Sequence, residues 1–377
     1  MSNFFPFGEP PSDDEIRLWR EGYRRYLIDK GMPAVAASDI AAKVPYRDDL
    51  YPVAGSDRKP LAKGREAGST TFQQTSGKPP VPASHSTTTR MRRLLDAASE
   101  IAVEPPSGKN IVFLHSTMCQ LGLPRSHVEG TAFERKCGNK ALQVTAGSLW
   151  NGERFVPQPI PYGSFPRLIL SWINAAAKRL GSPEVPLGRS GRELLRTLGK
   201  DTSGGKKGAY TMLKRQMLAI VASRLMLGFN AGEKAITRDG TPFERIEAWQ
   251  VKGYQSLDWP QTITLCESYF KELTEHAVPL DWRALKALRG SALAMDVYTM
   301  LAERLHRISG RSLVYWNNFY EQFGQEYQGK HPLEDFKRAF RLALRDALTV
   351  YPQARVRKVK GGLILLPSPP PIPYKEK

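Results

Sequence analysis

Apolar residues recur along most of the chain at spacings that predict two successive runs of helices and short strands. In the first run, three apolar segments predict strands, at 111–114, 141–146 and 154–156. Apolar residues at every third or fourth position then predict three helices, at 164–180, 190–199 and 208 to about 226. Ser190 is the expected N-cap of the middle helix, which stops at Gly199. Two alternating segments follow, around 235–238 and 246–254.

The second run is predicted in similar detail. It consists of helices at 281–288 and 291–308, a strand at 313–315, a brief helix at 316–323, a long helix at 332–350, and a hairpin of 354–359 and 362–366. Gly324 ends the brief helix, and Lys360-Gly361 forms the hairpin turn. Helix, helix, long helix and hairpin is the order of a winged helix, and a similar order precedes it. We therefore predict an α+β, mainly helical fold with two tandem winged-helix domains.

The first hundred residues differ in composition from the rest. Ser12 and Glu15 have capping-box spacing, and Ile16, Trp19, Tyr23 and Tyr26 then lie on one helix face among arginines. This helix either packs on the body of the protein or docks in the groove of a partner. Residues 32–89 are rich in Pro, Gly, Ser, Thr and Lys, which predicts a flexible tether, and a second helix is expected at 89–102.

These patterns divide the chain into four parts. We expect a largely disordered N-terminal extension with short amphipathic helices at 1–109, a first winged-helix-like domain at 110–276, a second winged-helix domain at 277–367, and a Pro-rich tail at 368–377.

The charge of the chain indicates a polyanionic partner. Fifty-five Lys and Arg against 37 Asp and Glu give a net charge of +18, which favours nucleic acid and, less strongly, an anionic membrane surface. Three scattered cysteines without CxxC spacing argue against a disulfide framework or a thiolate zinc site. No apolar stretch approaches the roughly 18 residues of a spanning helix, and the N-terminus lacks the pattern of a secretory signal. We expect a cytoplasmic protein.

Basic residues gather on the last long helix and hairpin. The helix carries cations at steps of one, three and four: Lys337, Arg338, Arg341 and Arg345. Its opposite face is apolar, with Phe336, Phe340, Leu344 and Leu348. The hairpin adds four cations and no acidic residue: Arg355, Arg357, Lys358 and Lys360. A basic helix beside a basic hairpin suits a major groove and its flanking phosphates, although an ordinary solvated helix face has the same pattern.

A second basic segment opens the helix predicted from Gly208. Lys206 and Lys207 precede this helix, and Lys214 and Arg215 follow one to two turns later, which predicts a contact with the DNA backbone. The segment is not a P-loop, because Lys200 replaces the first Gly and Lys207 replaces the Ser or Thr that holds magnesium. The six histidines form no HxH or HExxH pair. We therefore expect no enzyme, no metal and no cofactor.

Several segments, in order, resemble the RepA-type plasmid replication initiators of bacteria over about residues 112–371. They are IPYGSFPRLILSWI (160–173), LGRSGRELLRTLG (187–199), SGGKKGAYTMLKRQM (203–217), SALAMDVYTMLAERLHRI (291–308), and the closing YPQARV and PSPPPIP. The resemblance implies a tandem winged-helix protein that binds directly repeated double-stranded sites, the iterons, at a plasmid origin. It also implies origin opening, recruitment of the host initiator and replicative helicase, and repression of its own gene, commonly as a homodimer.

Two alternatives remain open at this point. A winged-helix transcriptional regulator differs from an initiator only in what it recruits. An RNA-binding or scaffolding protein belongs to another class, but the sequence shows no aromatic strand pair of the kind that stacks bases.

Overall fold

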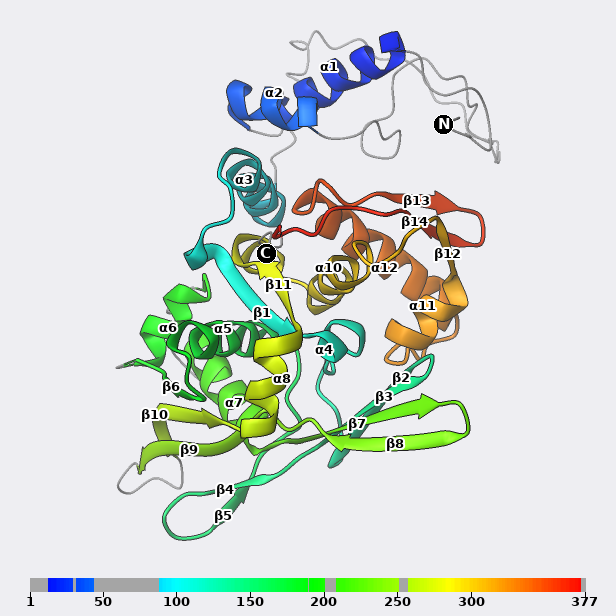
Figure 1. The fold of residues 1–377 in the computed structure, drawn as a ribbon. Coiled ribbons are helices and arrows are strands. Elements are labelled where there is room, and N and C mark those ends of the chain that lie inside the picture. The colour runs from blue at the N-terminus through cyan, green and yellow to red at the C-terminus, as the bar shows by residue number, and fades with distance from the viewer. Residues whose placement is uncertain are drawn as a thin grey trace, which may run out of the picture.

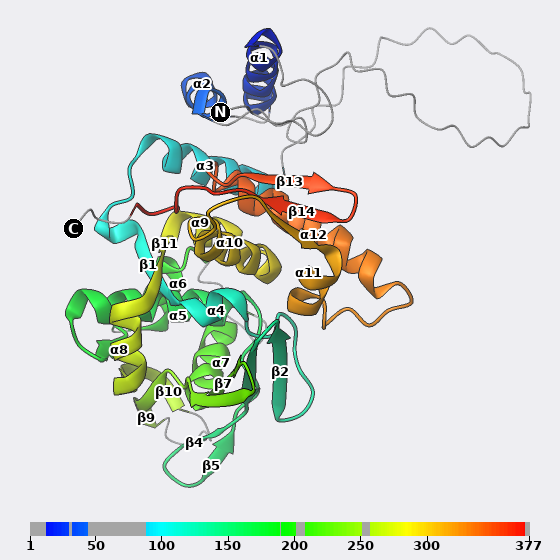
Figure 2. The ribbon, with the colours of Figure 1, turned by 45° about the vertical axis from the view of Figure 1, so that its right-hand side comes forward.

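The computed structural model describes residues 13–29, 32–43, 88–188, 190–200, 208–250 and 257–373. Its elements form three tiers (Figure 1). Helices α1 and α2 lie at the top, the unit from α9 to β14 lies in the middle, and the unit from α5 to β10 lies below. The same order is kept in the turned view of Figure 2.

The middle tier is the C-terminal unit, and it follows the predicted order of elements. Its elements are α9 (Trp282–Leu288), α10 (Ala292–Arg304), β12 (Ser312–Tyr315), α11 (Trp316–Phe323), α12 (Pro332–Thr349), β13 (Val356–Val359) and β14 (Gly362–Leu365). The three strands form an antiparallel sheet in the order β12–β14–β13. The predicted bounds of these elements are confirmed to within a few residues.

Helix α12 forms because its sequence satisfies both its start and its buried face. Pro332 occupies the first turn, where its missing N–H costs nothing, and Glu334 and Asp335 complement the helix dipole there. The predicted apolar face is confirmed, since Phe336, Phe340, Leu344 and Leu348 are all buried. Phe340 contacts the rings of Trp316 and Phe319, which fixes α12 against α11.

The lower tier repeats this order of elements from α10 onward. It contains α5 (Ser164–Leu180), β6 (Glu184–Pro186), α6 (Gly191–Thr197), α7 (Ala209–Ala222), β9 (Phe243–Gln250) and β10 (Leu257–Leu265). Its sheet has the order β6–β10–β9, so the last strand lies in the centre, as in the C-terminal unit. Ser190 caps α6 as predicted, because its hydroxyl accepts a hydrogen bond from the amide of Glu193.

The prediction that the third helix of this unit runs to Met226 is wrong. The helix ends at Ala222, and residues 224–231 form strand β7 (Arg224–Ala231). Leu225 and Leu227 are buried on either side of the half-buried Met226, which is the two-residue period of a strand. Strand β7 joins β2 (Ala132–Cys137), β3 (Lys140–Thr145) and β8 (Lys234–Asp239) in a sheet of order β2–β3–β7–β8.

The remaining elements connect the two units. Strand β1 (Ile111–His115) pairs antiparallel with β11 (Ala277–Asp281). These two strands are flanked by the 3-10 turn η1 (Gly108–Asn110), α4 (Ser116–Gln120) and α8 (Glu267–His276). Strands β4 (Ser148–Trp150) and β5 (Phe155–Pro157) form a separate hairpin. The predicted domain boundary after residue 276 lies where α8 ends and β11 begins. Buried residues of both units form one continuous hydrophobic cluster.

A buried ionic joint also connects the units. Arg167 of α5 donates to both carboxylate oxygens of Asp296 of α10, at 2.6 and 2.8 Å. Glu326, in the loop after α11, accepts from Arg135 of β2 at 2.6 Å. Burial, followed by the charge of Arg125, lowers the pKa of Arg135 to about 10. Burial by itself would raise the pKa of Glu326, but the charges of Arg125 and Arg135 outweigh it and hold that pKa below its usual range.

The N-terminal helices form a small cluster of their own. Helix α1 (Asp13–Asp29) packs on α2 (Ala34–Lys43), and α2 packs on α3 (Thr89–Val103). Tyr23 and Leu27 of α1 are buried there, which favours the packed alternative for this helix. The flexible tether predicted from residue 32 is wrong for α2, whose alanine-rich sequence is helical. Ser12, residues 44–87 and the side chains of Glu15 and Trp19 lie outside the description.

Candidate nucleic-acid interface

The exposed face of α12 carries three of the four predicted cations. Arg338, Arg341 and Arg345 are exposed, and Leu342, 49% exposed, lies among them. Positions 338, 341, 342 and 345 follow the i, i+3, i+4, i+7 spacing of one helix face. This face combines guanidinium donors with one exposed apolar side chain.

Contacts within the unit hold these three arginines in place. Arg338 pairs with Asp335 at 2.7 Å, and Arg345 pairs with Asp346 at 3.2 Å. The guanidinium of Arg341 lies over the ring of Trp316, 5.3 Å from its centroid. A guanidinium stacked on a buried ring keeps its N–H groups directed outward for a ligand, with less side-chain freedom to lose on binding.

Lys337, the fourth predicted cation, lies at the flank of this face. Its side chain is only 17% exposed, and its Nζ donates to Glu334 Oε1 at 2.8 Å. That hydrogen bond lowers the pKa of Glu334. Lys337 is therefore nearer to the body of the protein than Arg338 and Arg341.

The β13–β14 hairpin extends beside α12 and carries the other predicted cations. Arg355, Arg357, Lys358 and Lys360 are all exposed. The turn lies close to β12 because Gly362 has no side chain: a Cβ there would lie 2.1 Å from the carbonyl oxygen of Val314. Tyr315 of β12 lies next to this turn and is 57% exposed.

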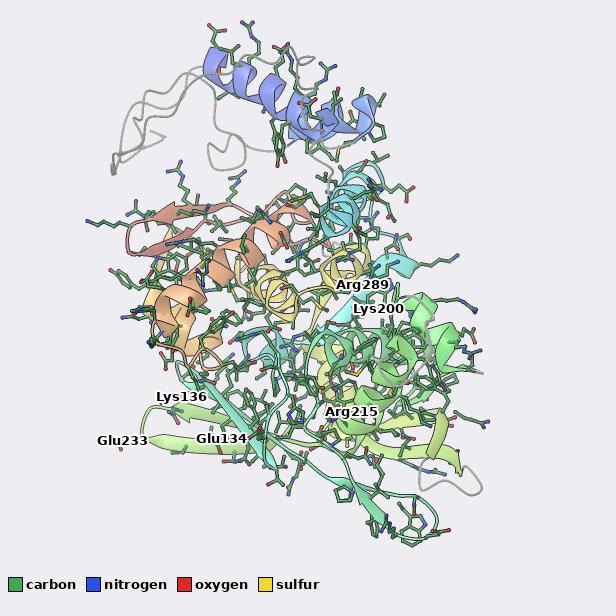
Figure 3. The ribbon with its side chains drawn as sticks, turned by 180° about the vertical axis from the view of Figure 1, so that it is seen from behind. Glu134, Lys136, Lys200, Arg215, Glu233 and Arg289 are labelled. Carbon is green, nitrogen blue, oxygen red and sulfur yellow. The ribbon has the colours of Figure 1, made fainter. Side chains whose placement is uncertain are left out.

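In the first unit, helix α7 is the counterpart of α12. Arg215 is exposed on α7 and is labelled in Figure 3, whereas Lys214 is half-buried. The predicted buried residues Leu213, Met217 and Ile220 face the core. Lys206 and Lys207 lie outside the described residues, so the predicted contact before this helix stays a prediction.

Leu342 and the Trp316–Arg341 pair were not predicted from the sequence. The spacing of Leu342 from Arg338 was a usable signal, since four residues place them on one face. The contact with Trp316 had no local signal, because it depends on how α11 packs against α12.

Other chemistry has less support within the described part of the chain. No group of three or more His, Cys, Asp or Glu side chains lies close enough together there to hold a metal ion. The Nδ1 of His306 lies 2.9 Å from the carbonyl oxygen of Ala302. Of the helices described, none is both long and apolar enough to cross a membrane.

The candidate interface is thus built on two units with one order of elements. The second unit has an exposed cationic helix and hairpin. Residues 160–317 match the family model described as "Plasmid encoded RepA protein". The resemblance to plasmid RepA proteins is confirmed over this segment, which runs from just before α5 into α11.

Two solved structures are also similar to the chain. Crystal structures of domains 2 and 3 of RctB, one of them a selenomethionine derivative, are 12% and 11% identical to it. Each covers 66% of this chain and 94% or 95% of its own, with TM-scores of 0.42 and 0.43. Among curated proteins, none matches the chain.

Proposed function

We propose that this protein is a plasmid replication initiator that binds directly repeated double-stranded DNA at its origin. The observation that carries the proposal is the exposed arginine face of α12 beside a hairpin with four cations and no acidic residue between 355 and 366. The family match over residues 160–317 supports the replication role.

In this proposal each unit is a winged helix, and α12 is the sequence-reading helix of the second. Arg338, Arg341 and Arg345 have the donors for bidentate contacts with guanine O6 and N7, the commonest specific contact in a major groove. Leu342 contacts a thymine methyl group. The Trp316 ring orients Arg341 before DNA arrives, which lowers the entropy lost on binding.

The hairpin and α7 complete the interface. Arg355, Arg357, Lys358 and Lys360 contact phosphates beside the groove that α12 enters. In the first unit, Lys214 and Arg215 bring α7 to the neighbouring groove, together with Lys206 and Lys207 ahead of it. Successive major grooves lie about 34 Å apart, so two such helices suit a repeat of roughly 20 base pairs.

The initiator works on plasmid DNA in the cytoplasm, without catalytic chemistry or a cofactor of its own. It promotes opening of the origin, brings in the host initiator and replicative helicase, and represses its own gene as a homodimer. These steps come from the RepA resemblance.

One experiment separates this function from that of a winged-helix transcriptional regulator. The gene with its flanking DNA is cloned into a circle that has no replicon, beside a matched circle carrying the Arg341→Gln/Arg345→Gln variant. An initiator gives colonies from the first circle and none from the second. Repression of a reporter without autonomous replication would support the regulator and contradict the initiator.

A further inference from the structure

The two proposed recognition helices are connected by a line of cations, and only its two members on α12 were predicted from the sequence. Lys200 follows α6, and Lys286 and Arg289 lie at the end of α9 and in the turn after it. Arg93 and Arg90 lie in the first turns of α3, and Arg345 and Arg341 lie on α12. We refer to these seven residues as the basic track.

Neighbouring members of the track are close to one another across the two units. A Cβ on Gly199 would lie 3.5 Å from Lys286 Cδ and 3.6 Å from an Arg289 nitrogen. Gly199, the residue before Lys200, is therefore beside the end of α9, although more than 80 residues separate them. The Nζ of Lys200 itself lies 5.0 Å from the centroid of the Phe165 ring. Figure 3 labels Lys200 and Arg289 next to each other, between α3 above and Arg215 below.

Helix α3 carries the track onward to α12. A Cβ on Gly290 would lie 3.0 Å from an Arg93 nitrogen, and Arg93 Nε donates to the carbonyl oxygen of Ala287 at 2.8 Å. Arg90 pairs with Asp346, the same carboxylate that Arg345 contacts. Asp346 lies beneath these arginines, with a side chain only 2% exposed, while those of Arg90 and Arg345 are 46% and 50% exposed.

The energetics of the track favour an anionic ligand. Burial, and then the charge of Arg90, lower the pKa of Arg93 against the opposing charge of Asp346, so Arg90 and Arg93 repel each other in the free protein. A polyanion that lies along the track offsets this repulsion. The track begins at Lys200, the last described residue before the segment that leads to α7, and ends on the exposed face of α12.

We infer that the basic track binds the phosphate backbone of duplex DNA between the two grooves that α7 and α12 enter. The inference rests on the proposed function and extends it to α3, α6 and α9. Helix α3 lies outside the segment that matches the RepA family. Contacts with phosphates fix the position of the duplex and carry no sequence information.

The test uses Lys200→Gln/Lys286→Gln in the full chain, because these side chains are not helix caps. Binding to a random-sequence duplex of about 40 base pairs, long enough for both grooves, is measured against salt concentration. Each phosphate contact contributes about 0.9 to the slope of log K against log salt, so the double variant is expected to be shallower by about 1.8. At a given salt concentration, the double variant is expected to lose the same factor in affinity for repeat-bearing duplex as for random-sequence duplex.

Two further variants control for charge and folding. Lys234→Gln/Lys271→Gln removes the same charge from exposed positions outside the track and is expected to keep the wild-type slope. Lys200→Arg/Lys286→Arg keeps the charge and is expected to have the wild-type slope. An unchanged slope in Lys200→Gln/Lys286→Gln, an equal drop in the first control, or a loss limited to repeat-bearing duplex overturns the track. Wild-type protein that binds no duplex overturns the proposed function as well, whereas normal wild-type binding with an unchanged variant slope overturns the track alone.

Discussion

The two units share one order of elements and one sheet order, but they differ in what they present to solvent. The second has an 18-residue helix, α12, with three exposed arginines and a short cationic hairpin after it. The first has a 14-residue helix, α7, with Arg215 exposed and Lys214 half-buried, and the β7–β8 hairpin is inserted before its last two strands. Under the proposed function we expect unequal tasks on DNA from this difference, with α12 reading sequence and α7 mainly contacting the backbone.

The largest expected effect comes from breaking the joint between the equivalent helices α5 and α10. Arg167→Met leaves the carboxylate of Asp296 buried without its bidentate partner, which costs about 3–5 kcal/mol in the free energy of unfolding. Chemical denaturation measures this change.

The control for this variant is Arg224→Met, which breaks an exposed pair with Asp239. Exposed pairs contribute about 0–1 kcal/mol. If both variants lost the same free energy of unfolding, the buried joint would contribute no more to stability than an exposed ion pair.

Changes in α12 are expected to remove specificity next. Arg341→Gln and Arg345→Gln should each cost about 1–3 kcal/mol in binding to the repeated site, the usual discrimination of one bidentate contact. Fluorescence anisotropy with repeat-bearing and scrambled duplexes gives both affinities, and thermal unfolding checks the fold. Equal losses on the two duplexes would show that α12 does not read sequence.

Changes in α7 are expected to lower affinity without changing specificity. Lys214→Gln/Arg215→Gln should weaken binding to the two duplexes by the same factor and lower the salt slope by about 0.9 per lost contact. A loss restricted to repeat-bearing duplex would give α7 the same sequence-reading task as α12.

The smallest expected effect is the response of the joint to acid. Because Glu326 has a lowered pKa in the folded protein, its contribution to stability is present at neutral pH and is lost as pH falls below its ordinary pKa of about 4.5. Denaturation is measured between about pH 3 and 6, which spans the ordinary pKa of a glutamate. The free energy of unfolding should depend less on pH in Glu326→Gln than in wild type. Identical pH dependences would contradict this assignment.

The sequence predicted the second unit better than the first, for a physical reason. Each element of the second unit has local signals, such as Pro332 at the start of α12 and Gly324 at the end of α11. In the first unit, the apolar run past Ala222 fits a helix as well as a strand, and only pairing with β3 and β8 decides for β7. Strand β2 is mostly polar and has no apolar pattern to reveal it.

The candidate interface was also predicted only in part, because only some of its residues have local sequence signals. The cations of α12 and its hairpin follow helix and strand periods, so the sequence locates them. Arg135 and Glu326 are 191 residues apart. Gly199, beside Lys200, approaches Lys286 and Arg289 although more than 80 residues separate them. Such contacts depend on tertiary structure, which no local pattern determines.

In the proposed complex with DNA, α7 and α12 lie in successive major grooves of one repeated site. Guanine-N7 methylation interference on the repeat-bearing duplex tests it most directly, because N7 lies in the major groove. We expect two clusters of interfering guanines about one helical turn apart, with the Arg341→Gln/Arg345→Gln variant losing one cluster and the Lys214→Gln/Arg215→Gln variant weakening the other. A single cluster, or the same cluster affected by both variants, would contradict the account.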